Sequence, residues 1–358
     1  MKRKLLGLLL AGLTIFSLAG CQKQEQPPQE QDQVQSQDQD KPQDSPEGGQ
    51  APADQPEEGV TVRVAALKGP TAMGMVKWME DAAQGQSQGS YEFTLAGAPD
   101  EISGGIVTGE YDVAAVPANL AAVLYNKTKG QVRLAALNTL GVLYLVESGD
   151  QIQSAEDLRG RTIYATGKGS TPEYALNYVL TQNGLTPGQD VQVEYKTEHA
   201  ELAALLASGQ ADLALLPQPF VTSALAQNES LRVALDLTEL WDQAAQGKSA
   251  LTMGCLIVRQ EFAQQHPQAL ETLMEEYGAS AAYVTDEANL EQAAALIEKN
   301  DIVKAAVAQK ALPQCNIVFI TGEEMRAKAE GFYQVLMEAD PAAVGGQLPG
   351  DEFYYQGQ

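Results

Sequence analysis

Histidine and cysteine are scarce in this sequence of 358 residues. There are two histidines, His199 and His266, which stand 67 positions apart, and three cysteines. Transition-metal sites are usually built from several such side chains at short, regular spacing. No CxxC or HxxxH spacing lies near either histidine. We therefore expect no metal site and no cofactor.

Positive charge is also in short supply. Lys and Arg together number 23 against 47 Asp and Glu, which gives a formal net charge of −24 at pH 7. The electrostatic field of a protein with this much negative charge repels phosphate backbones and anionic head groups, so we expect no nucleic acid partner. If the ligand is an anion, hydrogen-bond donors at short range must hold it.

Motifs for nucleophilic catalysis are missing as well. No GxSxG occurs, Ser170 has no histidine near it in the sequence, and no pair of carboxylates follows a predicted strand. A catalytic nucleophile needs a base beside it. We therefore predict no catalytic residues and no enzymatic activity.

No apolar run is long enough to cross a membrane comfortably. Instead, three basic residues at positions 2–4 precede an apolar run over residues 5–18, a profile typical of a secretory signal. The run ends in Leu-Ala-Gly-Cys at 18–21, which is similar to a bacterial lipobox. We predict a lipoprotein signal peptide over residues 1–20 and lipidation of Cys21. The alternative is an ordinary signal peptide with a chance cysteine.

Residues 21–59 have almost no apolar side chains and consist mainly of Gln, Pro, Asp, Glu, Ser and Gly. Such a segment cannot bury enough surface to offset its chain entropy, so we expect a disordered tether. The remaining chain, about 300 residues, is long enough for two domains with their own cores. Only Cys255 and Cys315 remain there, and an exported context permits a disulfide between them without requiring it.

Two stretches of the remaining chain match each other without a gap when one is shifted by 100 residues. A repeat of this kind indicates two copies of one structural unit. The matched pairs are Lys68 and Lys168, Gly69 and Gly169, Thr71 and Thr171, Gly109 and Gly209, Asp112 and Asp212, Ala114 and Ala214, and Pro117 and Pro217.

Each copy has the pattern of a βαβαβ unit. The first copy predicts strands at 62–67, 91–95 and 113–116, a helix from Thr71 to about Glu80, and another at 100–108. The second copy predicts strands at 162–166, 191–195 and 213–216, a helix from about Thr171 to Leu180, and another at 199–208. The third strand of each copy is fully apolar, which suits the middle of a parallel sheet.

The segments between and after the copies predict how two lobes are connected. Residues 133–147 form one long strand-like run that can cross between lobes, residues 251–259 return as a strand, and helical periodicity dominates from 261 onward, with a late strand at 317–320. We expect an α/β fold of two lobes, each a mostly parallel sheet flanked by helices. Lobe I comprises residues 60–147 and 251–358, and lobe II comprises residues 148–250. Parallel sheets bind ligands beyond the carboxyl ends of their strands, so the KGxT turns should face each other across a cleft.

The chain resembles the type II periplasmic binding proteins of the NMT1/THI5-like and SsuA-like group. The matching pieces are LKGPTAMGM at 67–75, YDVAAVPAN at 111–119, SAEDLRGRTI at 154–163, GKGSTPEYALNYVL at 167–180 and ADLALLPQPFVTSAL at 211–225. The resemblance implies a two-lobed (Venus flytrap) fold that closes on a nitrate, sulfonate, taurine or thiamine-precursor type of solute. It also implies an ABC permease and ATPase as partners, a place on the outer face of the cell membrane, and a monomer.

Residues at the expected cleft are candidates for ligand contact. Helix N-termini present free amide donors and a positive dipole end, which favours a small anion, although neutral heterocycles can use the same donors. Residues that only cap helices would look the same. The candidates are Lys68, Gly69, Pro70, Thr71, Met73, Pro117, Asn119, Lys168, Gly169, Ser170, Thr171, Gln218, Pro219 and Trp241.

Two alternatives of other classes remain open. Enzymes of the menaquinone pathway have a similar two-lobed fold, so turnover of a metabolite by the purified chain would favour an enzyme. A sensory or adhesive lipoprotein could keep the fold and the tether without any transporter. Neighbouring genes for a permease and an ATPase would discriminate against that second alternative.

Overall fold

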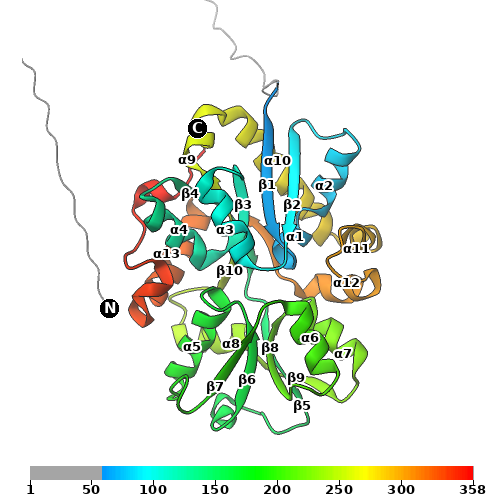
Figure 1. Cartoon of the computed structure of the whole chain (residues 1–358), viewed down its shortest axis with the longest axis vertical. Helices are drawn as coiled ribbons and strands as arrows, with labels where there is room; N and C mark the ends of the chain where they lie inside the picture. Colours follow the sequence, from blue (N-terminus) through cyan, green and yellow to red (C-terminus); the bar gives the residue numbers. More distant parts are fainter. Residues whose placement is uncertain (1–58, 358) are drawn as a thin grey trace, which may run out of the picture. The chain divides into compact units, whose positions relative to one another are not determined.

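The computed structural model describes residues 59–357, which lie within one compact unit spanning Pro52–Gln358 (Figure 1). The predicted signal peptide, the lipidation site at Cys21 and the tether up to residue 58 lie outside the described residues. Within the described part, no helix is both long and apolar enough to span a membrane, and no group of His, Cys, Asp and Glu is arranged to hold a metal ion. Cys255 and Cys315 are both buried and free, so they do not form a disulfide with each other.

Six strands form the first sheet, in the order β11-β4-β10-β3-β1-β2. β1 (Thr61–Leu67) lies between β2 (Ser90–Ala96) and β3 (Val113–Pro117), and the three strands run parallel. β10 (Thr252–Arg259) runs antiparallel between β3 and β4 (Val132–Leu140), and β11 (Ile317–Ile320) pairs with the outer edge of β4. We call this sheet with its helices the first lobe.

Helices cover both faces of the first sheet (Figure 1). One buried cluster joins the sheet to α3 (Pro99–Thr108), α4 (Ala118–Thr128) and α13 (Gly322–Ala339). The other joins it to α2 (Val76–Ala83), α9 (Gln260–Gln265), α10 (Pro267–Thr285), α11 (Leu290–Lys299) and α12 (Ala305–Ala311). All five residues of β3 are buried, as the fully apolar pattern of this strand predicts.

Five strands form the second sheet, in the order β7-β6-β8-β5-β9. They are β5 (Leu143–Ser148), β6 (Thr162–Thr166), β7 (Gln192–Lys196), β8 (Leu213–Pro217) and β9 (Leu231–Asp236). α5 (Thr171–Gln182) and α8 (Leu237–Ala245) cover one face, while α6 (His199–Ala207) and α7 (Phe220–Gln227) cover the other. We call this sheet with its helices the second lobe.

The two repeat copies fold as the same βαβαβ series, which confirms that part of the sequence analysis. β1, β2 and β3 of the first lobe correspond to β6, β7 and β8 of the second, and α3 corresponds to α6. In both lobes the first strand lies between the second and the third, and all three run parallel. The predicted α/β fold of two helix-flanked sheets is therefore correct, but both sheets are mixed and not mostly parallel. The reason is that an antiparallel strand, β10 or β5, pairs with the third strand of each copy.

The first predicted helix of the first copy is interrupted. It forms as α1 (Pro70–Met73) and α2, with Gly74 and Met75 between them. The hydroxyl of Ser280 in α10 donates to the Gly74 carbonyl at 2.8 Å and accepts from the Trp78 amide at 3.1 Å. These are the two groups that would bond to each other in a continuous helix, so the inserted hydroxyl breaks the ladder.

The long strand-like run at 133–147 also divides in two. β4 belongs to the first sheet and β5 to the second, with Gly141 and Val142 crossing between them. A Cβ at Gly141 would lie 2.3 Å from Thr238 Oγ1, so this crossing needs a residue without a side chain. The second sheet therefore begins at Leu143, ahead of the expected boundary at 148.

Candidate functional site

A cavity of about 80 Å³ lies between the two sheets, at the carboxyl ends of their parallel strands. Both lobes contribute to it, as the repeat predicts. A single water needs roughly 10 to 15 Å³ of such space, so the cavity has room for a small solute. The lining residues are Leu67, Lys68, Gly69, Pro70, Thr71, Gly97, Pro99, Pro117, Thr139, Val142, Leu143, Gly167, Ser170, Pro172, Thr197, His199, Pro217, Met253 and Gly254.

Besides the single-turn α1 at Pro70, four longer helices begin at this cavity. Pro99 and His199 are the first residues of α3 and α6, while Pro117 and Ser170 are the N-caps of α4 and α5. The positive ends of four helix dipoles therefore converge on one small space. Thr71, Thr139, Ser170 and Thr197 also line the cavity. The hydroxyls of Thr71, Thr139 and Ser170 already donate to the Leu67 carbonyl, Asn138 Oδ1 and the Gly167 carbonyl.

The cavity lining carries no negative side chain. Among the described residues that line it, none is Asp or Glu, and Lys68 is the one Lys or Arg. Lys68 Nζ lies 2.9 Å from Asp301 Oδ2, and the Asp301 side chain is 95% exposed. An exposed ion pair of this kind contributes little energy, so an anion in the cavity can compete with Asp301 for the ammonium.

His199 is a lining residue that the sequence analysis considered only as a metal ligand. Its Nδ1 lies 2.5 Å from Thr166 Oγ1, and its ring packs against Phe220 with centroids 5.2 Å apart. Burial lowers the pKa of His199 to about 4, so the imidazole is neutral at pH 7. The signal that could have identified it is its place at the start of the helix that follows β7, which matches the place of Pro99 after β2.

Six of the predicted site residues line the cavity: Lys68, Gly69, Pro70, Thr71, Pro117 and Ser170. Lys168 and Gly169, the repeat partners of Lys68 and Gly69, are exposed and do not line it. Lys168 Nζ instead lies 5.9 Å from the centroid of the Tyr195 ring. The two KGxT turns are therefore not equivalent in three dimensions.

Met73, Pro219 and Trp241 lie away from the cavity. Met73 and Trp241 have no exposed surface and belong to the hydrophobic core. Trp241 Nε1 donates to the Ser249 carbonyl at 3.2 Å, which satisfies its polar atom inside the core. Pro219 is the N-cap residue of α7.

Asn119, Thr171 and Gln218 are buried beside the cavity without lining it. Thr171 Oγ1 donates to Asn119 Oδ1 at 3.2 Å, and Gln218 Nε2 donates to Gln314 Oε1 at 2.9 Å. Both hydrogen bonds join the two lobes. The sequence predicted that Asn119, Thr171 and Gln218 contact a ligand. In the structure their side chains contact the opposite lobe.

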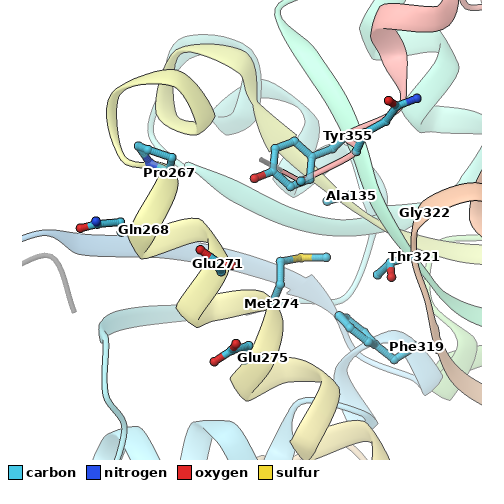
Figure 2. Close-up of a pocket in the computed structure, with 12 residues that line it drawn as sticks. Ala135, Pro267, Gln268, Glu271, Met274, Glu275, Phe319, Thr321, Gly322 and Tyr355 are labelled. Atoms are coloured by element: carbon cyan, nitrogen blue, oxygen red, sulfur yellow. The ribbon is translucent and has the colours of Figure 1, made fainter. Parts of the chain in front are cut away.

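A second and larger cavity of about 690 Å³ lies within the first lobe (Figure 2). Glu271, Met274 and Glu275 of α10 line one side of it, and Phe319 and Tyr355 lie on the other (Figure 2). No residue of the second lobe lines it, and its two carboxylates oppose an anion. The interlobe cavity is therefore the candidate site.

Comparisons with known proteins identify the family and the fold. Residues 76–310 match the family described as ABC transporter, phosphonate, periplasmic substrate-binding protein. Among curated proteins, no sequence matches the chain. The matching family differs in its description from the NMT1/THI5-like group named in the sequence analysis.

Solved structures of transport proteins share the fold. An ABC transporter protein from Parabacteroides distasonis is 24% identical, with a TM-score of 0.68, over 83% of this chain and 99% of that one. The periplasmic aliphatic sulphonate binding protein SsuA from Escherichia coli is 19% identical, with a TM-score of 0.64, over 83% and 92%. The periplasmic nitrate-binding protein NrtA from Synechocystis is 15% identical, with a TM-score of 0.55, over 70% and 69%. On the strength of its family match, the chain belongs to the periplasmic substrate-binding proteins of phosphonate-type ABC transporters.

Proposed function

We propose that this chain captures a small oxyanion of the phosphonate or sulfonate class between its lobes and delivers it to a membrane permease and ATPase. The observation that carries the proposal is the interlobe cavity, where four helix N-termini converge and no described lining residue is acidic. Amide donors at helix N-termini bind oxyanions through hydrogen bonds as well as through charge. A cavity of about 80 Å³ suits a head group with one or two carbon atoms.

His199 supports the same class of ligand. A neutral imidazole that uses Nδ1 for Thr166 keeps Nε2 for a hydrogen bond with the solute. Lys68 supplies the single positive charge of the lining. Together they would recognise an oxyanion by several donors and one charge, which suits a protein whose overall charge repels anions.

We also propose that the protein is exported and anchored through lipid on Cys21, with residues 22–59 as a spacer on the outer face of the membrane. The support is the basic, apolar and small-residue order of residues 1–21. The Cys21→Ser variant should be recovered in the soluble fraction after cell breakage, and membrane retention equal to that of the wild type would contradict the anchor.

The test of function is a binding titration with methylphosphonate, ethanesulfonate and nitrate, with ethylamine as a cationic control. At least one oxyanion should raise the melting temperature, because a ligand at about 100 times its Kd adds about 2.7 kcal/mol to the free energy of unfolding. Lys68→Met should weaken binding roughly tenfold through loss of a charge-assisted hydrogen bond. Lys168→Met is the matched control, because this repeat partner lies outside the cavity lining.

A response to ethylamine in place of the oxyanions would overturn the proposal. So would an equal loss of affinity in Lys68→Met and Lys168→Met, since only Lys68 lines the cavity. Release of a chemically altered product during the titration would favour an enzyme.

A further inference from the structure

Asn119 of the first lobe and Thr171 of the second form a two-way contact with no exposed surface on either residue. The Asn119 amide N–H donates to Thr171 Oγ1 at 3.3 Å, and the same hydroxyl donates to Asn119 Oδ1 at 3.2 Å. Asn119 Nδ2 donates in turn to the carbonyls of Gly169 and Ala343. One first-turn amide of α4 is thus satisfied by the Thr171 hydroxyl of the opposite lobe.

A second polar contact joins the lobes between Gln218, in the loop that follows β8, and Gln314, at the end of a short 3-10 helix (Leu312–Gln314) after α12. The side-chain carbonyl of Gln218 accepts from the amide and the hydroxyl of Thr222 at the start of α7. This fixes the Gln218 amide so that Nε2 donates to Gln314 Oε1 at 2.9 Å. Val303, which precedes α12 in the first lobe, packs against the buried cluster of the second lobe.

The two contacts involve different sides of the described unit. In Figure 1, α4 and α5 lie on the left, whereas α12 and α7 lie on the right. None of Asn119, Thr171, Gln218 and Gln314 lines the cavity. Their hydrogen bonds can form only while the lobes are together, because each has a partner in the opposite lobe.

We propose that Asn119 and Gln314 are positioning residues that hold the lobes closed, so that they set the affinity for every solute without touching any of them. A ligand that needs the closed state binds with an apparent Kd equal to its intrinsic Kd divided by the closed fraction. The link to affinity rests on the proposed function, whereas the closure itself is measurable without a ligand.

The test is single-molecule energy transfer between dyes on the two lobes of the full chain. Lys127→Cys and Gln189→Cys place the dyes at exposed positions, and Cys21→Ser removes the competing thiol. Cys255 and Cys315 are buried, and burial raises the pKa of both thiols, so they label poorly. Gln314→Ala should lower the closed-to-open ratio about fivefold, and Asn119→Ala should lower it more because several buried groups lose their partner.

Asn126→Ala is the matched control. Asn126 lies on α4 as Asn119 does, and its Nδ2 donates to the carbonyls of Val344 and Gln347, both in the first lobe. This variant should keep the wild-type distribution of transfer efficiencies. Distributions for Asn119→Ala and Gln314→Ala that match the wild type would overturn the proposal.

A second readout separates positioning from ligand contact. Methylphosphonate and ethanesulfonate should lose affinity by the same factor in Gln314→Ala, so that the ratio of their Kd values stays constant. A changed ratio would make the residue a ligand contact and overturn the positioning role. If neither compound binds the wild type, the proposed function fails for these solutes, while the energy-transfer result still decides whether the contacts hold the lobes closed.

Discussion

His199 combines three features that bear on its chemistry. It lines a cavity, it begins a helix, and its Nδ1 is engaged by Thr166 Oγ1 at 2.5 Å. Burial lowers its pKa from 6.5 to about 4, so the imidazole stays neutral where a free histidine would begin to charge. The cavity thus gains a hydrogen-bonding ring whose charge does not change at physiological pH.

This pKa has a consequence for stability in acid. Above pH 6.5 the ring is neutral in the folded and unfolded chain, so it contributes no pH dependence. Between pH 6.5 and about 4 the unfolded chain takes up a proton that the folded protein does not, so falling pH destabilises the folded state. Below about pH 4 both states are protonated and the loss is complete.

We expect His199→Gln to remove this part of the acid sensitivity. At about pH 4.5 the wild type should have lost about 2 kcal/mol more of its free energy of unfolding than the variant, relative to about pH 7. Urea unfolding of both proteins at the two pH values measures the difference. Parallel losses in the two proteins would mean that the ring titrates normally in the folded state.

Asn119 and Thr171 illustrate what the residue pattern could and could not predict about the site. The sequence correctly places Thr171 at a helix start, where amide and hydroxyl donors are available. Asn119 was a candidate because its side-chain amide follows Pro117 at the end of a strand, and the helix that begins there was not predicted. A ligand and a partner helix can use the same donors, and the choice depends on a distance of about 3 Å between residues 52 positions apart. Local patterns contain no such distance, so these two positions were predicted as ligand contacts.

The third strands of the two repeat copies, β3 and β8, are both fully buried but begin differently. Asp112, just before β3, is 5% exposed and accepts from the Arg63 amide, Nε and Nη2 at 3.0, 2.9 and 2.6 Å. Arg259 Nη1 lies 3.6 Å from the same carboxylate. Asp212, its repeat partner before β8, is exposed.

The repeat therefore supplies a matched pair of substitutions. Asp112→Ala should lower the free energy of unfolding by about 2 to 4 kcal/mol, because it leaves Arg63 and Arg259 without their shared partner. Asp212→Ala should change it by less than about 0.5 kcal/mol, as is usual for an exposed side chain. Urea unfolding of the two variants measures both values. Equal effects would mean that the ion pairs of Asp112 add nothing to the first lobe.

The spacing of apolar residues predicted the strands and helices of the two repeat copies well. The helices bury one face, and the third strands β3 and β8 are buried at every residue. The prediction failed where one side chain from a distant element intervenes. The break between α1 and α2 depends on the hydroxyl of Ser280, which lies about 200 positions away in the sequence. The division between β4 and β5 depends on the close approach of Gly141 to Thr238. Such contacts are tertiary, so a single pass along the chain cannot reveal them.

One buried cluster extends through both lobes. It contains residues of α13 and α4 in the first lobe and of α5 and α8 in the second. At its centre, the rings of Trp241 and Phe332 lie 5.6 Å apart, and Tyr178 packs on Trp241 at 4.8 Å. α13 therefore stabilises both lobes, even though it lies at the end of the chain and far from α8 in the sequence.

A shared core predicts that the two lobes unfold together. Calorimetry of the wild type should give one transition, with a van't Hoff enthalpy close to the calorimetric enthalpy. Phe332→Ala removes a fully buried ring at the contact between the lobes, so it should lower the free energy of unfolding by about 3 to 5 kcal/mol and broaden or split the transition.

Phe262→Ala is the control for the loss of a buried ring. Phe262 belongs to a cluster built from the first lobe alone, so its removal should lower the melting temperature without splitting the transition. A single sharp transition in Phe332→Ala would show that the lobes remain coupled without this ring. The coupling would then come from the contacts that the variant leaves intact. These are the other side chains of the shared cluster, the hydrogen bonds of Asn119 and Gln218 between the lobes, and the two strand crossings.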